Sequence, residues 1–415
     1  MALVASIRRA RTGAGVVSFL LILATALVAG CSQPQTPPPA DQPAEATVEP
    51  QGPRCVIVMI GDGMGFEQVK AASLYAYGRE GALAMQQMPH QGEMTTYPAP
   101  GPDHVTGSAA AGTALATGRK ANNGVVSLAI PGDGQPLTTA LELHARWGHM
   151  TGLVSTTTMC HATPAAFGAH APKRSMYNEI AECYLNDTRP NVLFGGVSGT
   201  RDGKPVGMAV DKARAAGYTV LRDRLDLLNA PVRPDVHFSG QFGRGHMPYM
   251  YDLFAGTAAG AERLPTLSEM TAKALAVLST DPDGLFLMVE GGRIDHAGHG
   301  NHLERNIFET LEFDRAVETV LRWADGRDDV LVIVTADHEC GGLTVTADRG
   351  IGRMPEVTWS TKGHTGVPVP IFAQGPGAEA VVGTLDNTDV FRLTVGKRPA
   401  TTPGLVAEPL GAAAD

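Results

Sequence analysis

The 415-residue chain is poor in positive charge, in aromatic residues and in cysteine. It carries 33 Lys and Arg against 42 Asp and Glu, a net charge of −9, and its basic residues cluster only in three arginines near the N-terminus. This balance argues against a nucleic-acid-binding surface. Charged residues make up 18% of the chain and hydrophobic residues 43%, which excludes an intrinsically disordered protein. No internal repeat is visible, which argues against a repeat architecture.

The longest apolar run lies at the N-terminus. Arginines at positions 8, 9 and 11 precede the apolar segment 14–30, and Cys31 follows at once. A basic start before such a segment is typical of an export signal, and Val28-Ala29-Gly30-Cys31 resembles the lipobox of bacterial lipoproteins. We therefore expect residues 1–31 to be a lipoprotein signal peptide, cleaved before a lipid-anchored Cys31 on the periplasmic face of the membrane. Simple secretion, to the periplasm or the cell exterior, and a retained membrane helix are the alternatives.

Composition divides the rest of the chain into three parts. Residues 32–52 are rich in proline and nearly free of apolar side chains, which predicts a disordered, extended linker. Residues 53–396 form the expected folded body. The Pro/Ala-rich tail, 397–415, is expected to be disordered.

Four cysteines besides Cys31 occur in the body. An exported protein folds where disulfides persist, and a bond between Cys160 and Cys183 is the one we consider first. Sequence spacing does not determine connectivity, so the pairing among Cys55, Cys160, Cys183 and Cys340 stays open.

The body has the pattern of an α/β protein. Apolar runs at 56–60, 285–289 and 330–334 suit strands that are buried on both faces. Segments with helical periodicity, such as 137–147 and 303–323, lie between runs of this kind. This alternation predicts a mostly parallel sheet covered by helices.

Each of these three apolar runs is followed by an acidic residue. The acids are Asp62, Glu290 and Asp337. Because the carboxyl ends of parallel strands meet at one edge of a sheet, where ligands bind, the three side chains are expected to lie close together. Three clustered carboxylates repel one another unless cations hold them. The alternative is three unrelated turn residues, since Asp is common after strands.

Histidines near these acids extend the set of candidate metal ligands. Asp295, His296 and His299 follow Glu290 within ten residues, His338 follows Asp337 directly, and His364 lies in a Gly-His-Thr-Gly segment. Imidazole combined with carboxylate is typical of zinc sites, whereas a site made of oxygens alone suits magnesium. The sequence offers ligands for both kinds of site.

Ser108 is a candidate nucleophile. It lies in a run of small residues, Thr106-Gly-Ser-Ala-Ala-Ala-Gly-Thr113, at the expected start of a helix. Backbone N–H groups and the helix dipole stabilise an anion at that position, and a neighbouring metal ion lowers the pKa of a hydroxyl. The alternative is a tightly packed Ala/Gly helix with an N-terminal serine.

Taken together, these motifs resemble the alkaline phosphatase family. The resemblance rests on IGDGMG at 60–65, VTGSAAAGTALATG at 105–118, HATPAAFGAHAPKR at 161–174, VEGGRIDHAGH at 289–299, VTADHE at 334–339 and GHTG at 363–366. The six segments occur in the family's order and spacing, and the resemblance extends from about Arg54 to Gly396, nearly the whole of the body. They imply a three-layer α/β sandwich, with a central, mostly parallel sheet flanked by helices.

The resemblance implies hydrolysis of phosphate monoesters to an alcohol and inorganic phosphate. Ser108 would be the nucleophile that becomes phosphoserine, and Arg174 would bind two phosphate oxygens with its planar guanidinium. Inorganic phosphate would be both product and inhibitor.

The resemblance also implies two zinc ions and one magnesium ion, held by carboxylates, histidines and one threonine hydroxyl. The ligands would be Asp295, His299 and His364 for the first zinc, Asp62, Asp337 and His338 for the second zinc, and Asp62, Glu290 and Thr163 for magnesium. Two metal ions about 4 Å apart stabilise the entering and leaving oxygens of an in-line displacement.

Several positions depart from the family's bacterial pattern. Gly107 stands where many members have an aspartate that orients the arginine, so Arg174 is expected to hold phosphate less tightly. His161 and His296 resemble the animal branch and lie beside the metal ligands, and His161 leaves the choice of metal at the third site open. Gly243 replaces a glutamate of the animal calcium site, which is therefore not expected.

The C-terminal half departs from the animal branch in one further respect. Residues 339–363, 25 in number, separate His338 from His364, so the crown insert that helps animal members to dimerise must be reduced. A homodimer remains a possible assembly. The Gly- and Pro-rich region 197–270 is expected to carry loops that shape access to the pocket.

Two other functions compete with this interpretation. One is a phosphodiesterase or sulfatase on the same metal scaffold, but such enzymes usually replace the serine with threonine or a modified cysteine. The other is a non-catalytic phosphate- or metal-binding lipoprotein, which would tolerate the loss of a ligand or of the nucleophile. Ser108, Arg174 and the complete ligand set favour the phosphomonoesterase.

Overall fold

The computed structural model describes residues 52–197, 200–201, 204–205, 207–258 and 260–397. The expected signal peptide with its lipid-anchored Cys31, the linker up to residue 51 and the tail after Lys397 lie outside these residues and stay predictions. Within the described part of the chain, no helix is long and apolar enough to cross a bilayer.

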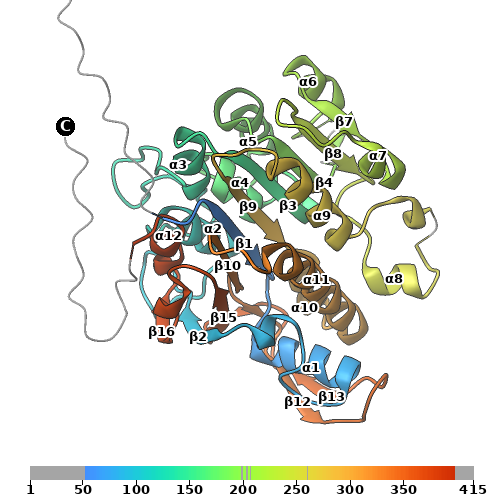
Figure 1. Ribbon diagram of the computed structural model, residues 1–415. Helices are drawn as coiled ribbons and strands as arrows, with labels where there is room; N and C mark the ends of the chain where they lie inside the picture. Colours follow the sequence, from blue (N-terminus) through green and yellow to red (C-terminus); the bar gives the residue numbers. More distant parts are fainter. Residues whose placement is uncertain (1–51, 198–199, 202–203, 206, 259, 398–415) are drawn as a thin grey trace, which may run out of the picture. The chain divides into compact units, whose positions relative to one another are not determined.

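A ten-stranded sheet forms the centre of the fold (Figure 1). Its strands are, in spatial order, β16 (Gly383–Asp386), β2 (His90–Thr95), β15 (Val369–Gln374), β10 (Val330–Thr335), β1 (Cys55–Ile60), β9 (Leu285–Glu290), β3 (Met150–Thr158), β4 (Val192–Gly196), β8 (Phe238–Phe242) and β7 (Thr219–Leu221). Strand β15 runs antiparallel to both of its neighbours, and the other pairs are parallel. The predicted mostly parallel sheet is confirmed.

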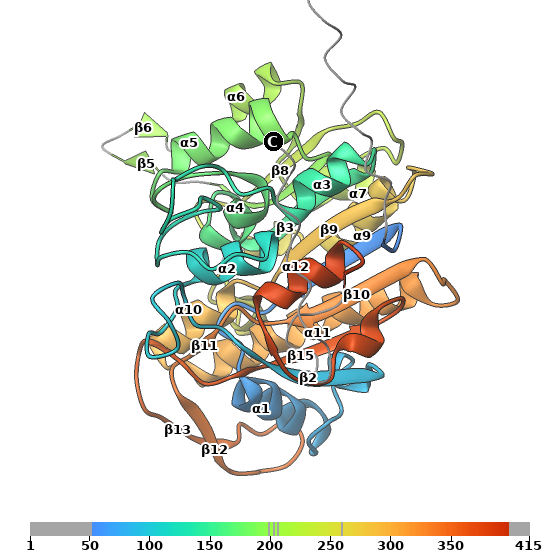
Figure 2. The ribbon, with the colours of Figure 1, turned by 90° about the vertical axis from the view of Figure 1, so that its left-hand side faces the viewer.

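Helices cover both faces of this sheet (Figures 1 and 2). One face carries α2 (Ser108–Thr117), α3 (Ala140–Arg146), α4 (Ala162–Gly168) and α12 (Thr388–Thr394). The other carries α9 (Leu267–Leu278) and α11 (Leu303–Ala324), which pack against each other. The three-layer α/β sandwich is therefore confirmed.

The three apolar runs of the sequence are the central strands. Every residue of β10, β1 and β9 is buried, because helices cover the sheet on both sides, and this explains their unbroken apolar sequences. The register pairs Ile60 of β1 with Thr335 on one side and with Glu290 on the other. The strands therefore end level with one another, at one edge of the sheet.

The two helical patterns are both present, with one difference in extent. Helix α11 matches the predicted 303–323 closely, whereas α3 starts at Ala140 rather than near residue 137. Thr139 stops the helix there, because its hydroxyl accepts the N–H of Glu142 while the Glu142 carboxylate accepts the N–H of Thr139. This capping box determines the first turn.

The reduced crown is a small hairpin in the segment between His338 and His364. Strands β12 (Leu343–Ala347) and β13 (Glu356–Trp359) pair antiparallel, and β11 (Glu339–Cys340) pairs antiparallel with β14 (His364–Thr365). The insert is thus limited to about one hairpin, as predicted.

Shorter elements complete the described chain. They are α1 (Phe66–Tyr77), α5 (Tyr177–Glu182), α6 (Val210–Ala215), α7 (Arg224–Asn229), α8 (Met250–Phe254), α10 (Arg293–Gly300), η1 (Met85–Gln87), η2 (Cys183–Thr188), η3 (Ala261–Arg263), η4 (Ala378–Ala380), β5 (Thr200–Arg201) and β6 (Lys204–Pro205). The region 197–270, expected to carry loops, thus also supplies two strands of the main sheet and several short helices.

The disulfide that we considered first is not formed. The Cys183 thiol is free and half-buried, with its sulfur 3.9 Å from the carbonyl oxygen of His170. Cys160 is buried near the start of α4. The prediction of a Cys160–Cys183 bond is therefore wrong for this structure.

Candidate metal centre and active site

The three acids that follow the central strands lie together at the carboxyl edge of the sheet. Asp62, Glu290 and Asp337 are all fully buried. Burial is the main cause that raises the pKa of Asp62 well above its usual value, followed by the negative charge of Asp337. Burial likewise raises the pKa of Glu290. Such a cluster is stable in its ionised form only when cations compensate it.

A glycine in the first motif allows the ligand-bearing segments to approach each other. Gly63 has φ +77°, and a Cβ atom at this position would lie 2.7 Å from Cα of Asp295. Its backbone N–H also donates to Oδ1 of Asp337 at 3.1 Å. A side chain here would therefore separate segments that the cluster needs in contact.

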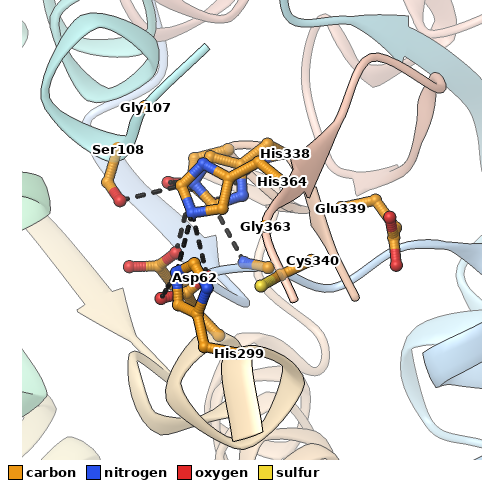
Figure 3. A network of polar contacts seen from close by, with 12 residues as sticks. Asp62, Gly107, Ser108, His299, His338, Glu339, Cys340, Gly363 and His364 are labelled. Carbon is orange, nitrogen blue, oxygen red and sulfur yellow. Dashed lines mark hydrogen bonds and ion pairs between the residues drawn. The ribbon is translucent and has the colours of Figure 1, made fainter. Parts of the chain in front are cut away.

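The first predicted zinc set, Asp295, His299 and His364, is brought together. The Nε2 atoms of His299 and His364 are 3.1 Å apart (Figure 3). They lie 3.4 Å and 3.2 Å from the two carboxylate oxygens of Asp295. A tetrahedron with metal bonds of about 2.0–2.1 Å has edges of about 3.3 Å. The spacing of these atoms therefore fits one zinc ion.

Hydrogen bonds set the tautomers of both histidines for metal binding. Nδ1 of His364 donates to the carbonyl oxygen of Thr106 at 2.9 Å, and Nδ1 of His299 donates to that of Lys362 at 2.6 Å. A carbonyl can only accept, so each Nε2 carries a lone pair. Holding the far nitrogen in this way is typical of metal-ligating histidines.

The second predicted zinc set, Asp62, Asp337 and His338, also forms one group, with its ligand atoms within 4.8 Å of one another. Nε2 of His338 lies 3.1 Å from Oδ2 of Asp337 and 3.6 Å from Oδ1 of Asp62. Although burial alone would raise the pKa of Asp337, the adjacent His338 leaves it below its usual value.

A histidine lies beside the predicted magnesium set. Asp62 and Glu290 group with His161 within 4.8 Å, and the buried hydroxyl of Thr163 belongs to α4, which begins next to His161. One oxygen of Glu290 accepts hydrogen bonds from the hydroxyls of Ser155 and Thr157. The other oxygen stays available to a metal.

Buried polar atoms without partners show that these residues fit metal ions. Among the described residues, six buried oxygens of the three sets have no hydrogen-bond partner: both of Asp62, Oε1 of Glu290, Oδ1 of Asp295, Oδ2 of Asp337 and Oγ1 of Thr163. Buried polar atoms are rarely left unpaired. Their convergence at one place is explained by bound cations.

Ser108 is placed over this cluster as the first residue of α2 (Figure 3). It is buried, and its Oγ lies 3.3 Å from Nε2 of His338. Asn123 holds the segment before it, accepting from the N–H of Gly107 at 2.8 Å and donating to the carbonyl oxygen of Val105 at 3.0 Å. Sequence reasoning did not find this role of Asn123, because no motif includes it.

Arg174 is anchored by a histidine rather than by a carboxylate at position 107. Its Nη2 lies 2.9 Å from Nε2 of His161, and its backbone N–H donates to the carbonyl oxygen of Gly124 at 2.7 Å. His161 thus contacts the guanidinium of Arg174 where the sequence, which has Gly107 in place of an aspartate, predicted the loss of a contact.

Two further groups near the site were missed from the sequence. Cys340 lies within 4.8 Å of the ligand atoms of the first zinc set. His246, from the loop after β8, lies beside His161 and His296. Burial lowers the pKa of His246 to about 4 and that of His296 to about 3, so both rings are neutral at neutral and alkaline pH.

Sequence comparison shows the family of the chain. The alkaline phosphatase family model matches residues 53–355. The streptomycin-6-phosphate phosphatase of Streptomyces griseus is 36% identical over 447 aligned residues, which cover 92% of this chain and 96% of that protein. Alkaline phosphatase 3 of Bacillus subtilis is 30% identical, covering 81% of this chain and 87% of that protein. The chain belongs to the alkaline phosphatase family.

Solved alkaline phosphatases share its fold. The cold-active enzyme of a Shewanella species has a TM-score of 0.71 and 28% identity, over 82% of this chain and 98% of that one. A mutant of the enzyme from the Antarctic bacterium TAB5, with a TM-score of 0.69 and 28% identity over 84% of this chain and 99% of that one, was solved with bound magnesium. Family and fold support a metal-dependent phosphomonoesterase.

The Asp62→Asn variant tests whether cations hold the carboxylate cluster. In metal-free protein at pH 8 the variant should be more stable than the wild type by on the order of 1 kcal/mol or more, because it removes one buried, repelling charge. In protein loaded with zinc and magnesium it should be less stable, because two metal sets share Asp62. Urea denaturation with and without metal measures both differences. The exposed Glu262→Gln is the control, and an effect of the same sign in both states would contradict the account.

A buried glutamate near the site predicts a pH dependence of stability. Oε1 of Glu309 in α11 accepts the N–H of Met250 at 2.7 Å, and burial raises the pKa of Glu309 from 4.5 to about 7. The folded state therefore binds the proton more tightly than the unfolded state. Its contribution is complete below pH 4.5 and is lost as the pH rises through 7.

The Glu309→Gln variant removes this titration. Between pH 5.5 and 8.5 the unfolding free energy of the metal-loaded wild type should fall by about 2 kcal/mol relative to the variant. Urea unfolding across this range is the measurement, and the exposed Glu304→Gln on the same helix is the control. A difference between wild type and Glu309→Gln that stays constant with pH would refute the prediction.

Proposed function

We propose that this protein is an alkaline phosphatase that hydrolyses phosphate monoesters through a phosphoserine on Ser108, with two zinc ions and one magnesium ion as cofactors. One observation carries the proposal: Oγ of Ser108, at the N-terminus of α2, lies 3.3 Å from Nε2 of His338, which itself lies 3.1 Å from Oδ2 of Asp337. A hydroxyl in this position adjoins a metal site and a helix N-terminus, both of which favour its anionic form.

The proposed ligands are those grouped by the structure. The residues that would hold metal are Asp295, His299 and His364 for one zinc, Asp62, Asp337 and His338 for the other, and Asp62, Glu290 and Thr163 for magnesium. When bound, the metal ions supply positive charge that neutralises the phosphoryl group and lowers the pKa of the attacking hydroxyl.

Ser108 and Arg174 would act directly on the substrate. The Ser108 oxygen forms a bond to phosphorus while the bond from phosphorus to the ester oxygen breaks, and the alcohol leaves with a proton. Water then attacks the phosphoserine, which restores the Ser108 hydroxyl and releases inorganic phosphate. Arg174 would bind phosphoryl oxygens through its N–H groups, with His161 limiting its motion.

The surroundings of the enzyme are part of the proposal. The N-terminal pattern supports export, with Cys31 as a lipid anchor, and small phosphate monoesters outside the cytoplasm are the proposed substrates. Inorganic phosphate, which resembles both substrate and product, is the proposed inhibitor. A homodimer is also part of the proposal. Because the β12–β13 hairpin is short, its interface would lack the crown that animal members use.

Hydrolysis of p-nitrophenyl phosphate at pH 9–10 tests the function. The protein from Ser32 onward is assayed as purified, after EDTA, and after return of zinc with magnesium. We expect activity to disappear on chelation and to return with the metals. Ser108→Ala should lower kcat on the order of 10³-fold or more, since the nucleophile is gone, while Ser279→Ala at the end of α9 should leave it unchanged. If folded, metal-loaded protein had no activity, the proposed function would be rejected in favour of a diesterase, a sulfatase or a binding protein.

A second candidate, within the same chemistry, is a phosphatase dedicated to phosphorylated aminoglycosides. It is favoured by the 36% identity to the Streptomyces griseus streptomycin-6-phosphate phosphatase, which extends over 92% of this chain.

The ratio of kcat/KM for streptomycin 6-phosphate to that for p-nitrophenyl phosphate separates the two candidates. A general phosphomonoesterase should give a ratio within about tenfold of one, because its binding energy is concentrated on the phosphoryl group that all substrates share. A ratio on the order of 10² or more would reject the general enzyme in favour of the dedicated one.

A further inference from the structure

Three histidines beside the metal cluster form a group of their own. His161 precedes α4, His246 follows β8 and His296 lies in α10. One ring nitrogen from each lies within 4.8 Å of the other two. The ring centroids of His246 and His296 are 4.5 Å apart, and those of His161 and His246 are 5.4 Å apart. By composition alone this group could hold a metal ion.

The hydrogen bonds of the three rings leave no nitrogen lone pair for a metal ion. Nε2 of His161 accepts from the Arg174 guanidinium at 2.9 Å, Nδ1 of His296 accepts from the Arg293 guanidinium at 2.8 Å, and Nδ1 of His246 accepts from the backbone N–H of Thr158 at 3.2 Å. Guanidinium and backbone N–H groups can only donate. The opposite nitrogen of each neutral ring must therefore carry the hydrogen.

The histidines of the first zinc set show the reverse arrangement. Carbonyl oxygens hold the Nδ1–H groups of His299 and His364, and both Nε2 atoms are left with lone pairs. In His246 and His296 the Nδ1 lone pair is already used, so Nε2 presents an N–H group. The same residue type thus offers acceptors to cations at one site and donors at the other.

The loop that carries His246 is firmly positioned. The N–H of Met247 donates to the carbonyl oxygen of Thr156 at 2.9 Å, and that of Gly245 to the carbonyl oxygen of Val197 at 2.9 Å. The segments at Gly196 and Gly245 approach so closely that a Cβ atom on Gly196 would lie 2.1 Å from the carbonyl oxygen of Gly245. His246 is therefore held over the ends of β3 and β4.

The orientation of His296 depends on a stack of side chains. Arg293, which donates to its Nδ1, lies over the ring of Tyr249 at 3.8 Å, and Arg305 lies over the same ring at 4.5 Å. Asp252 in turn accepts two hydrogen bonds of 3.0 Å from Arg305. This stack limits the rotation of the Arg293 guanidinium and so determines which nitrogen of His296 accepts its hydrogen bond.

We propose that His246 and His296 form an oxyanion subsite, in which their two Nε2–H groups donate hydrogen bonds to the phosphoryl group of the substrate and to inorganic phosphate. Both rings are half-buried, and neither Nε2 has a partner among the hydrogen bonds of the described residues. Arg174, linked to the third ring of the group, supplies positive charge at the same place. The inference rests on the proposed function and adds His246 as a substrate-binding residue.

Calorimetric titration of the metal-loaded protein with inorganic phosphate tests the subsite without relying on turnover. His246→Phe keeps a ring but removes both nitrogens, and we expect it to bind phosphate about tenfold more weakly, the effect of losing one hydrogen bond to a charged group. His246→Gln, whose amide offers an acceptor for Thr158 and an outward N–H, should recover most of the affinity. The exposed His302→Phe is the control, and metal content is measured for every variant.

Each outcome separates the alternatives. Weaker binding by His246→Phe with unchanged metal content supports the subsite, and recovery in His246→Gln supports the role of the N–H donor. Loss of one metal equivalent in His246→Phe overturns it in favour of a metal site. Equal phosphate affinity in wild type and His246→Phe overturns this inference alone. No phosphate binding by the metal-loaded wild type overturns the proposed function as well.

Discussion

The burial of three carboxylates at one edge of the sheet is the constraint on which the rest of the structure depends. Strands β10, β1 and β9 are adjacent and end in register, so Asp62, Glu290 and Asp337 cannot avoid one another. Helices on both faces exclude the water that would otherwise screen them. Such a cluster is stable in its ionised form only around cations, which explains why histidine ligands, unpaired oxygens and the tight turn at Gly63 converge there.

Two kinds of histidine surround this cluster, and their second nitrogens distinguish them. Where the backbone offers a carbonyl oxygen, as at His299 and His364, the ring presents a lone pair and suits a cation. Where the second nitrogen accepts from a backbone N–H or a guanidinium, as at His246 and His296, the other nitrogen of the ring carries a hydrogen and suits an anion. A phosphomonoesterase needs both, because the phosphoryl group must be bound by positive charge on one side and by donors on the other.

The sequence predicted the parts of this arrangement that local rules control. Apolar runs ending in acids indicated parallel strands whose ends meet, and a run of small residues placed Ser108 at the start of a helix; both are confirmed. Contacts between distant segments that do not follow from the order of parallel strands could not be predicted. Nothing local shows that β15 runs antiparallel, that the Cys183 thiol stays free, or that His246, 85 positions after His161 (246 − 161), meets it in space. Such contacts depend on loops whose course no periodicity encodes.

Anomalous X-ray diffraction at the zinc edge, from crystals grown with zinc and magnesium, tests the central claim most directly. The account predicts two zinc peaks, one bounded by Asp295, His299 and His364 and the other by Asp62, Asp337 and His338, with a third metal near Glu290. It also predicts no peak among His161, His246 and His296. Well-ordered crystals without metal at the carboxylate cluster would show that protonation, rather than cations, compensates the buried charge, and would contradict the account.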